Sequence, residues 1–319
     1  MKRLRIGVLG CASIAKRSVI PAIKSIPDFE LVAIASRTKE KAEEFALAFD
    51  CEAIEGYQNL IDRKDIDVIY MPLPTGLHEE WGLKALHAGK HIHIEKSLAM
   101  NYESAKKMVD LAREKGVLIM ENFMFIYHQQ HQFVKGLIAQ GEIGALRCFR
   151  SSFGFPPLDK ASFRYNKSLG GGALLDAAAY TIRASQLFLG NDLKVEAATL
   201  NTENTEVDIF GGAYLKAANG MFAEVAFGFD NFYQCNYEIW GSKGKLIVQR
   251  AFTPGAEFKP QITLEQQGDV IHYEVEAENH FITLLTEFKR CVLERDFESK
   301  YEEILNQSRL IQELKEKAN

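Results

Sequence analysis

The sequence has no block of like charge and no long apolar run, and these absences exclude several classes of protein. Its 319 residues have a net charge of −5, and no cluster of Lys or Arg offers a surface to nucleic acid or to an anionic membrane. No apolar segment approaches the ~20 residues of a membrane-spanning helix, and Leu4–Leu9 is too short for the apolar core of a signal peptide. We therefore expect a cytoplasmic protein that acts on a small molecule.

Cysteine is scarce, and its spacing is not that of a disulfide framework or a metal site. The five cysteines stand at positions 11, 51, 148, 235 and 291, which suits a reducing compartment. Two histidine pairs, His91/His93 and His128/His131, have the spacing of metal ligands on a strand and on a helix, but neither pair has a third ligand at a suitable distance along the chain. We therefore predict no metal site.

Internal repeats and low-complexity linkers are also missing, and a composition of 47% apolar and 25% charged residues is ordinary for a globular protein. The length predicts about two domains. Over residues 1–122, six βα repeats predict a doubly wound parallel sheet, the Rossmann fold, as a dinucleotide-binding domain. Over residues 123–319, strands joined by Gly or Asn turns predict an α+β domain with a large open, mostly antiparallel sheet. This is the domain expected to bind the substrate and to form oligomers. The expected fold class is α/β.

Runs and periods of apolar residues place the individual elements. In the first domain five strands can be placed individually, at 4–9, 29–35, 66–71, 91–94 and 117–120. In the second we expect strands at 146–155, 195–201, 207–216, 220–229, 233–240, 244–248, 261–265 and 270–276, and helices at 172–189, 279–294 and 301–317. One face of such a sheet is left without helices, and it is expected to join copies of the chain into a homodimer or homotetramer.

The first strand leads into a turn that is similar to a phosphate-binding loop. The chain reads G-C-A-S-I-A, in which Gly10 matches the first glycine of the dinucleotide fingerprint G-x-G-x-x-G/A. Ala15 is an accepted variant at the third position, whereas Ala12 leaves less room for a pyrophosphate. Backbone amides and the positive end of the following helix still face that site. Alone, the turn also fits an ordinary strand–turn–helix without a ligand.

The end of the second strand indicates which dinucleotide is bound. An acid at this place binds the ribose 2′-hydroxyl of NAD, whereas a cation accommodates the 2′-phosphate of NADP. The chain has Ser36 and Arg37 there, and Lys39 or Lys41 can add positive charge. This pattern favours NADP(H), with NAD(H) still possible. A solvated arginine at a strand end is the alternative interpretation.

Glu95 and Lys96 follow the strand His91–Ile94 and are expected at the edge of the sheet where ligands bind. Beside a nicotinamide, the Lys96 ammonium can stabilise the alkoxide charge that develops during hydride transfer. Glu95 can pair with Lys96 or hold a cofactor hydroxyl. Elsewhere such a dipeptide is usually a solvated ion pair, but its place at the end of a Rossmann strand favours a functional role.

Five motifs together resemble those of the Gfo/Idh/MocA family of NAD(P)-dependent oxidoreductases over the whole chain. They are G-C-A-S-I-A at 10–15, P-L-P-T at 72–75 with His78, E-K at 95–96, E-N-F-M at 121–124 and G-G-G-A-L-L-D-A-A-A-Y at 170–180. Within the family, the chain is most similar to nucleotide-sugar 3-ketoreductases. This similarity is carried by G-C-A-S-I-A and by the segments 180–184, 186–190 and 250–254, the last of which reads R-A-F-T-P.

The resemblance implies that Lys96 is catalytic and that the loops after the strands hold the cofactor. The residues expected to bind it are Gly10, Cys11, Ala12, Ser13, Ile14, Ser36, Arg37, Lys41, Pro72, Leu73, Thr75, His78, Glu95, Lys96 and Asn122. The implied reaction is the reduction by NADPH of a keto group on a nucleotide-linked sugar. The same residues would serve a dehydrogenase of a free sugar or of a trans-dihydrodiol, and some relatives are non-catalytic dinucleotide-binding regulators.

Many relatives have a histidine where this chain has Tyr180. Because Tyr180 stands four residues after Asp176, the two side chains share one face of the expected helix, and with Lys96 they form the expected substrate site. A tyrosine beside an ammonium can donate a proton to a substrate oxygen, so Lys96 and Tyr180 are the expected catalytic pair. Alternatively, Tyr180 only packs at a domain interface.

Three residues depart from the pattern of the family. Ser97 replaces the proline that commonly follows E-K, which is expected to loosen the turn at Lys96. Ile126 replaces an arginine and Gln129 a proline, so the contact made by that arginine is not expected here.

Overall fold

The computed structural model describes residues 3–318, which divide into two compact units. Unit 1 runs up to Asn122 and includes Phe281–Leu305, and unit 2 is Phe123–His280 with the residues from Asn306 onward. The division by sequence placed everything after residue 122 in the second domain, whereas residues 281–305 pack with unit 1. Within residues 3–318, every helix is too short or too polar to cross a membrane.

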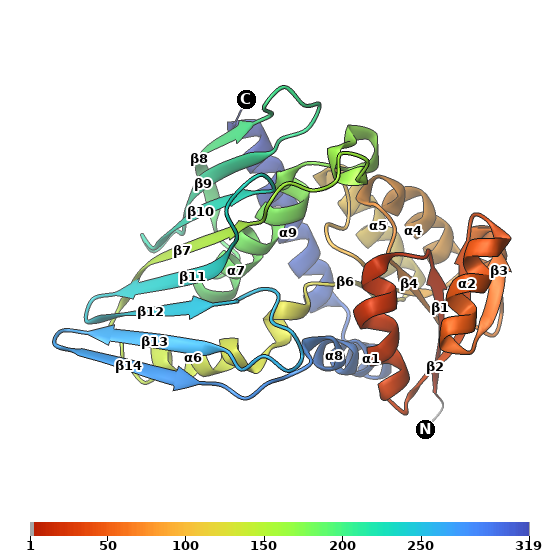
Figure 1. Ribbon diagram of the computed structural model, residues 1–319, viewed down its shortest axis with the longest axis horizontal. Coiled ribbons are helices and arrows are strands. Elements are labelled where there is room, and N and C mark those ends of the chain that lie inside the picture. Colours follow the sequence, from red (N-terminus) through yellow and green to blue (C-terminus); the bar gives the residue numbers. More distant parts are fainter. Residues whose placement is uncertain (1–2, 319) are drawn as a thin grey trace. The chain divides into compact units, whose positions relative to one another are not determined.

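Unit 1 contains a six-stranded sheet in which all neighbouring strands are parallel, in the order β3-β2-β1-β4-β5-β6 (Figure 1). Its strands are β1 Leu4–Leu9, β2 Phe29–Ser36, β3 Glu52–Glu55, β4 Val68–Met71, β5 His91–Ile94 and β6 Ile119–Glu121. Its helical segments, with 3₁₀ and π turns labelled η, are η1 Ala15–Val19, α1 Ile20–Ser25, α2 Lys39–Phe49, α3 Tyr57–Ile61, η2 Thr75–Leu77, α4 His78–His87, α5 Tyr102–Lys115, α8 His280–Glu294 and the start of α9 Glu298–Lys317. The Rossmann sheet predicted from the sequence is confirmed.

Local sequence explains how these elements begin and end. The strand β4 is buried at all four residues, as expected of a parallel strand covered on both faces. Helix α5 begins at Asn101, whose side chain accepts a hydrogen bond from the N–H of Ser104, and ends at Gly116 in the left-handed conformation. The strand order reverses between β1 and β4, and ligands of such sheets bind at the carboxyl ends of the strands beside that reversal.

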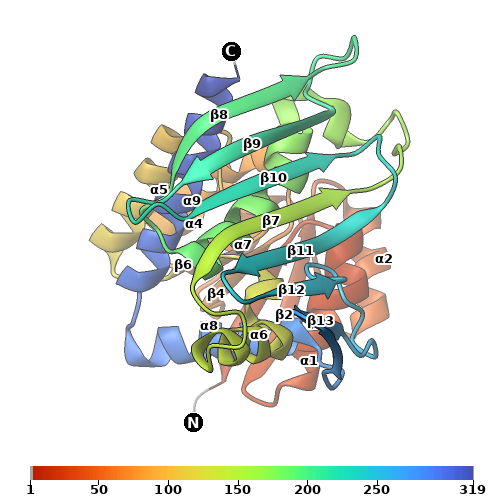
Figure 2. The same ribbon diagram turned by 90° about the vertical axis from the view of Figure 1, so that its left-hand side faces the viewer.

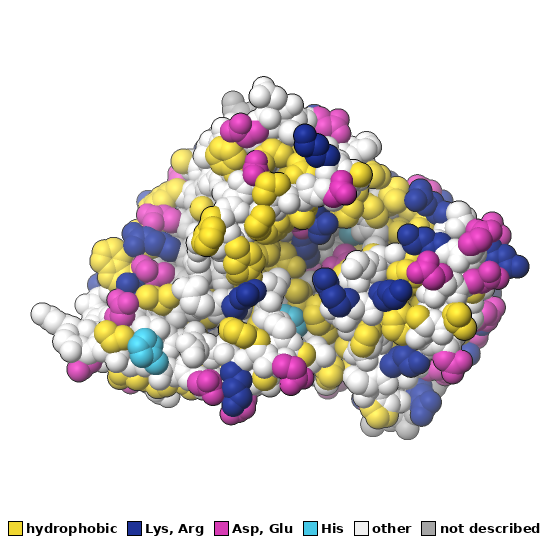
Figure 3. All heavy atoms as spheres, viewed as in Figure 1, with side chains coloured by type: hydrophobic (Ala, Val, Ile, Leu, Met, Phe, Trp, Pro, Cys, Tyr) yellow, Lys and Arg dark blue, Asp and Glu magenta, His cyan; other side chains and the backbone are white. Residues whose placement is uncertain are grey.

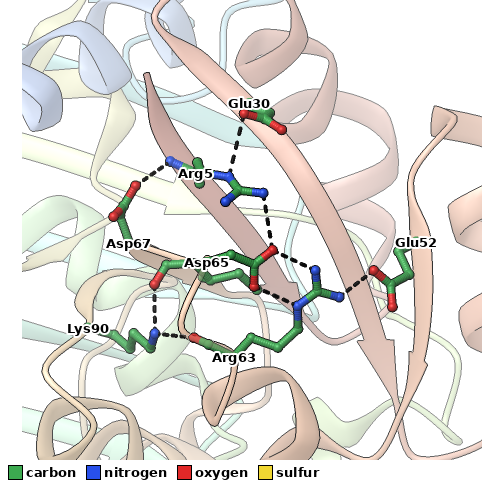
Figure 4. A network of polar contacts seen from close by, with 8 residues as sticks. Arg5, Glu30, Glu52, Arg63, Asp65, Asp67 and Lys90 are labelled. Atoms are coloured by element: carbon green, nitrogen blue, oxygen red, sulfur yellow. Dashed lines mark hydrogen bonds and ion pairs between the residues drawn. The ribbon is translucent and has the colours of Figure 1, made fainter. Parts of the chain in front are cut away.

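A network of charged side chains joins the opposite, amino ends of these strands (Figure 4). Arg63 binds Asp65 through Nε at 2.8 Å and Nη2 at 2.7 Å, and this hydrogen bonding lowers the pKa of the Asp65 carboxyl. Arg5 on β1 donates to the same carboxylate at 3.1 Å. The buried Lys90 donates to the carbonyl oxygens of Arg63 and Ile66. The network therefore stabilises the amino edge of the sheet, away from the ligand edge.

Unit 2 contains an eight-stranded sheet in the order β14-β13-β12-β11-β7-β10-β9-β8, antiparallel except for β7 beside β10. Its strands are β7 Leu146–Gly154, β8 Lys194–Asn201, β9 Phe210–Lys216, β10 Phe222–Gly228, β11 Gln234–Gly241, β12 Gly244–Gln249, β13 Gln261–Gln266 and β14 Asp269–Glu274. Its helical segments are η3 Met124–Tyr127, α6 Gln129–Ala139, η4 Phe163–Tyr165, η5 Lys167–Leu169, η6 Leu174–Ala178, α7 Ala179–Leu189 and the end of α9. The predicted open, mostly antiparallel sheet is confirmed.

Helices cover one face of this sheet, and the other face is open (Figure 2). On β11, Cys235, Tyr237 and Ile239 are buried, whereas Trp240 is 50% exposed. This period of two is that of a sheet with one covered face. Across the molecular face in Figure 3, acidic and basic side chains are interspersed, in keeping with the small net charge.

Buried histidines make the stability depend on pH. Burial lowers the pKa of His91 and His93 to about 4 and that of His131 and His280 to about 3. The unfolded chain takes up these protons near pH 6.5, whereas the folded chain resists protonation until lower pH. The contribution of these histidines to the free energy of unfolding is therefore fully present above pH ~6.5. It is lost as the pH falls toward 4, by about 1.4 kcal/mol per pH unit for each histidine.

The change His93→Phe tests this account. The His93 ring lies 5.2 Å from that of Tyr70 and 5.6 Å from that of Phe288, so a phenyl ring retains the packing without binding a proton. In urea unfolding, the variant should lose about 2–3 kcal/mol less than the parent between pH 6.5 and 4. Above pH 7 the free energy of unfolding should depend on pH in the same way for the variant and the parent. Equal slopes in the acid range would contradict the assignment.

Candidate active site

The turn after β1 has the geometry of a phosphate-binding loop. Gly10 has φ +126°, and a Cβ there would lie 2.8 Å from Cδ2 of Leu73 in the loop after β4. The positive φ favours glycine here, and its missing side chain leaves room for Leu73. In the described part of the chain, no side chain caps the helical turn Ala15–Val19 that follows. The helix starts at Ser13, and the Lys16 amide donates to the Ala12 carbonyl oxygen at 3.2 Å, so the amides before Lys16 are the ones that can face an anion.

The residues predicted to choose the dinucleotide lie together. Ser36 is buried at the end of β2, and Arg37 and Lys41 are exposed beyond it. Burial raises the pKa of the Cys11 thiol, while a hydrogen bond with Ser36 and the charge of Lys41 oppose this rise. Burial likewise raises the pKa of Tyr57, and the charge of Arg37 opposes it. The structure therefore brings two cations and a hydroxyl to the turn after β1.

His78 joins two of the predicted cofactor loops. Its ring is fully buried, with Nε2 2.8 Å from the carbonyl oxygen of Leu73 and Nδ1 3.1 Å from those of Ser97 and Leu98. Burial lowers the pKa of His78 in spite of these carbonyl groups. The side chain thus positions the loops 72–75 and 95–98, and its predicted contact with a cofactor stays a prediction.

Glu95 is held by two neighbouring strands. Its Oε1 accepts hydrogen bonds from the Tyr70 hydroxyl at 2.7 Å and from the Asn122 side-chain amide. Burial raises the pKa of Glu95, and these two hydrogen bonds oppose the rise. Tyr70 is fully buried, and burial, followed by the charge of Glu95, raises the pKa of its phenol, which therefore stays a donor. Tyr70 was not among the site residues predicted from the sequence, because it lies within an apolar strand and so has the pattern of a core residue.

The loop that contains Lys96 is fixed on both sides. Besides the contacts of His78, the Leu98 amide donates to Oε1 of the buried Glu121 at 2.7 Å. Ser97 is 2% exposed, and the peptide bond before it is cis. The loosening expected from a serine in place of proline is thus offset by buried polar contacts around the loop.

In unit 2, Tyr180 lies in a cage of phenyl rings. Its ring centre is 4.9 Å from that of Phe153, 5.7 Å from Phe125, 5.8 Å from Phe252 and 5.9 Å from Phe123. The side chain is 7% exposed. The cage fixes the ring and excludes water from its faces. Because Lys96 belongs to unit 1, the pairing of these two residues remains a prediction.

Asp176 lies in a π-helical turn, Leu174–Ala178, that the sequence-based helix did not anticipate. Its carboxylate accepts a hydrogen bond from Nε of Arg164 at 2.6 Å. A Cβ on Gly171 would lie 2.4 Å from the carbonyl oxygen of Arg164, so this glycine permits the close approach. Asp208 caps the same turn through the Leu174 amide. Arg164 and Asp208 were missed because only the fold brings them to the helix.

Other predicted features have structural roles. Gln129, in place of a family proline, donates its backbone N–H to Glu278 at 2.6 Å, a bond that proline cannot form. Within residues 3–318, no three His, Cys, Asp or Glu side chains are placed to hold a metal ion. His131 instead lies 2.9 Å from the Tyr237 hydroxyl and 3.1 Å from the Ala251 carbonyl oxygen. Ile126 is partly exposed in η3.

Comparison with known proteins assigns the family. Residues 4–123 match the NAD-binding Rossmann fold of the oxidoreductase family, and residues 131–247 match the GFO/IDH/MocA C-terminal domain. The chain is 44% identical, over 91% of its length and 88% of the relative's, to the dTDP-3,4-didehydro-2,6-dideoxy-alpha-D-glucose 3-reductase of Saccharopolyspora spinosa. The chain belongs to the Gfo/Idh/MocA oxidoreductase family.

One solved structure has a closely similar fold. This is KijD10, a 3-ketoreductase from Actinomadura kijaniata, in complex with NADP and TDP-benzene. The TM-score is 0.96 at 39% sequence identity, and the match covers 99% of this chain and 98% of that one. A curated 3-reductase from the same organism is 41% identical over 97% of this chain and 93% of its own length.

In this Gfo/Idh/MocA oxidoreductase, the change Tyr70→Phe tests whether Tyr70 positions Glu95. Loss of one donor to a partly buried carboxylate should raise the pKa of Glu95 further and weaken NADPH binding by about 1–1.5 kcal/mol. NADPH titrations at several pH values should show that the affinity begins to fall at a higher pH in the variant than in the parent as the solution is acidified. Tyr214→Phe, which alters a 37% exposed phenol on β9, is the control. An unchanged affinity and pH profile would refute the positioning role.

Proposed function

We propose that this chain uses NADPH to reduce a keto group of a nucleotide-linked sugar. The observation that supports this most strongly is the similarity over nearly the whole chain to 3-ketoreductases, one of them solved with NADP and TDP-benzene. NADP in that relative agrees with the preference predicted from Ser36 and Arg37. The domain roles follow: residues 1–122 bind the dinucleotide, and residues 123–319 bind the substrate and join subunits.

The residues of unit 1 fit this cofactor. The missing side chain at Gly10 lets the backbone approach a pyrophosphate, and the cations after β2 suit a 2′-phosphate. When bound, NADPH supplies the hydride. The proposed contacts are those of Gly10, Cys11, Ala12, Ser13, Ile14, Ser36, Arg37, Lys41, Pro72, Leu73, Thr75, His78, Glu95, Lys96 and Asn122.

Lys96 and Tyr180 are proposed to act on the substrate oxygen, with Asp176 beside them. The ammonium of Lys96 holds the carbonyl oxygen and stabilises its developing negative charge, and the Tyr180 hydroxyl donates the proton. Structures of KijD10 with a Tyr-to-Phe change and with a Lys-to-Ala change support this assignment. Their positions differ by 186 − 102 = 84 residues, and those of Lys96 and Tyr180 also differ by 180 − 96 = 84.

The catalytic proposal is tested by single-turnover oxidation of NADPH with a dTDP-linked 3-ketosugar. Lys96→Ala should retain NADPH binding and slow turnover by about 10²–10³-fold, because it removes a stabiliser of the alkoxide. Tyr180→Phe retains the ring in its cage and should slow the chemical step by about 10²-fold and remove one limb of its pH profile.

Two controls separate this enzyme from the other candidates. Turnover of a free sugar or a trans-dihydrodiol in preference to the nucleotide-linked sugar would point to the alternative dehydrogenases. A parent protein that binds NADPH but oxidises it with none of these substrates would contradict the catalytic proposal and favour a regulator. An unchanged rate in Tyr180→Phe would assign the proton to another donor.

The cofactor preference is tested with Arg37→Ala. NADPH should bind more tightly than NADH to the parent, and the variant should lose about 1.5–3 kcal/mol of NADPH affinity because a charge-assisted bond to the 2′-phosphate is removed. NADH affinity should not change. The same loss for both cofactors would show that Arg37 does not read the 2′-phosphate.

The open face of the eight-stranded sheet is proposed as the surface of a homodimer or homotetramer. On it, Arg150 binds Glu224 at 2.6 Å and lies 5.4 Å from the ring centre of the exposed Trp240. A large exposed aromatic side chain over a paired arginine suits an interface between copies. A cytoplasmic location completes the proposal, supported by five cysteines that are all free thiols.

The change Trp240→Glu tests this interface. The change removes the large aromatic side chain from the proposed contact and adds a charge that must lose water when the surfaces meet, so it should shift the sedimentation equilibrium toward the monomer. Leu47→Glu, at an 87% exposed residue of α2, is the control and should sediment like the parent. A Trp240→Glu protein with the parent's mass would place the interface elsewhere.

A further inference from the structure

The segment R-A-F-T-P contributes Phe252 to the cage of Tyr180, and its first residue has an unusual conformation. Arg250 follows β12 and has φ +54°, in the left-handed region that non-glycine residues seldom adopt. The neighbouring backbone holds it there, because the Ala251 amide donates to the Cys235 carbonyl oxygen at 2.9 Å and the Phe252 amide to Cys235 Sγ at 3.3 Å. Such conformations persist where the surroundings fix them, often at ligand sites.

The guanidinium of Arg250 is oriented but not neutralised. Its Cζ lies 4.8 Å from the ring centre of Tyr233, and its Nη1 donates to the Tyr233 hydroxyl at 2.9 Å. Arg250 is exposed, and among residues 3–318 no carboxylate forms an ion pair with it. The Tyr233 ring thus orients the guanidinium, and one hydrogen bond uses only one of its N–H groups. The remaining N–H groups are suited to bind an anion.

This cation lies near the proposed proton donor, within the same unit. Phe252, two residues after Arg250, is one wall of the cage, with its ring centre 5.8 Å from that of Tyr180. Three extended residues span at most about 10 Å, so the backbone of Arg250 lies within that distance of the backbone of Phe252, roughly the length of a sugar ring and a diphosphate. In a nucleotide-linked sugar, the diphosphate is bonded directly to the sugar that contains the reacting carbon.

We propose that Arg250, held by Tyr233, binds the diphosphate of the nucleotide-linked substrate and so selects it over a free sugar. The inference rests on the proposed function. A planar guanidinium matches two phosphate oxygens at once, and its fixed orientation reduces the entropy lost on binding. Because NADPH also contains a diphosphate, the experiment must tell the two sources apart.

The test titrates dTDP, and separately NADPH, into the parent, Arg250→Ala and Arg250→Lys by calorimetry. Arg250→Ala should weaken dTDP binding by about 10–100-fold and leave NADPH affinity within about twofold. Arg250→Lys keeps the charge without the fork and should lie between the two. Arg147→Ala, which removes an exposed arginine at the far end of β7, is the control and should bind dTDP like the parent.

Steady-state rates complete the test. With the dTDP-linked ketosugar, Arg250→Ala should raise KM by a factor similar to the loss of dTDP affinity while kcat changes little, since Arg250 binds the diphosphate and not the reacting carbonyl group. Tyr233→Phe should raise KM less, because the ring remains. A fall in NADPH affinity, or an unchanged affinity for dTDP, would overturn the assignment. A parent that binds dTDP through Arg250 but reduces no ketosugar would refute the proposed function and leave the diphosphate site intact.

Discussion

The site in unit 1 depends on buried polar side chains that fix the loop after β5. This loop contains Lys96, and it is held by His78 from the start of α4, by Glu121 at the end of β6 and by Glu95, which Tyr70 binds from β4. Each contact joins neighbouring strands at their carboxyl ends. In a partly desolvated place, an ammonium is useful for catalysis only if its distance to the substrate is fixed. Here hydrogen bonds between the ends of the strands, and not apolar packing alone, hold the loop that contains Lys96.

Much of the fold could be predicted, because the parallel sheet is encoded locally by apolar runs between amphipathic helices. The strand that was not predicted individually, β3, has four residues of which only Ile54 is buried, so its apolar signal is weak. The glycine turn and the strand-end residues Ser36 and Glu95 could be found for the same local reason. Tyr70 and Arg164 could not, because a buried tyrosine and a loop arginine gain their roles only from residues that folding brings to them.

The departures from the family pattern show how one fold tolerates different residues at its loops. Gln129 replaces a proline that would fix the backbone by its ring, and it fixes the same backbone by donating its N–H to Glu278. Ser97 likewise lies in a loop whose carbonyl and amide groups are bound by His78 and Glu121. In both places hydrogen bonds replace a covalent restraint. Those around Ser97 are buried, whereas the hydrogen bond of Gln129 is exposed.

Burial also explains why a tyrosine, Tyr180, suits the position where many family members have a histidine. A histidine donates a proton as an imidazolium, and burial among four phenyl rings disfavours any charged side chain. A phenol is neutral while it still has its proton, so Tyr180 can occupy the cage in its uncharged form. In the proposed proton transfer, the charge appears only as the proton leaves, which is when the ammonium of Lys96 is most effective. The proposal therefore requires both an aromatic cage around Tyr180 and a lysine on a rigid loop.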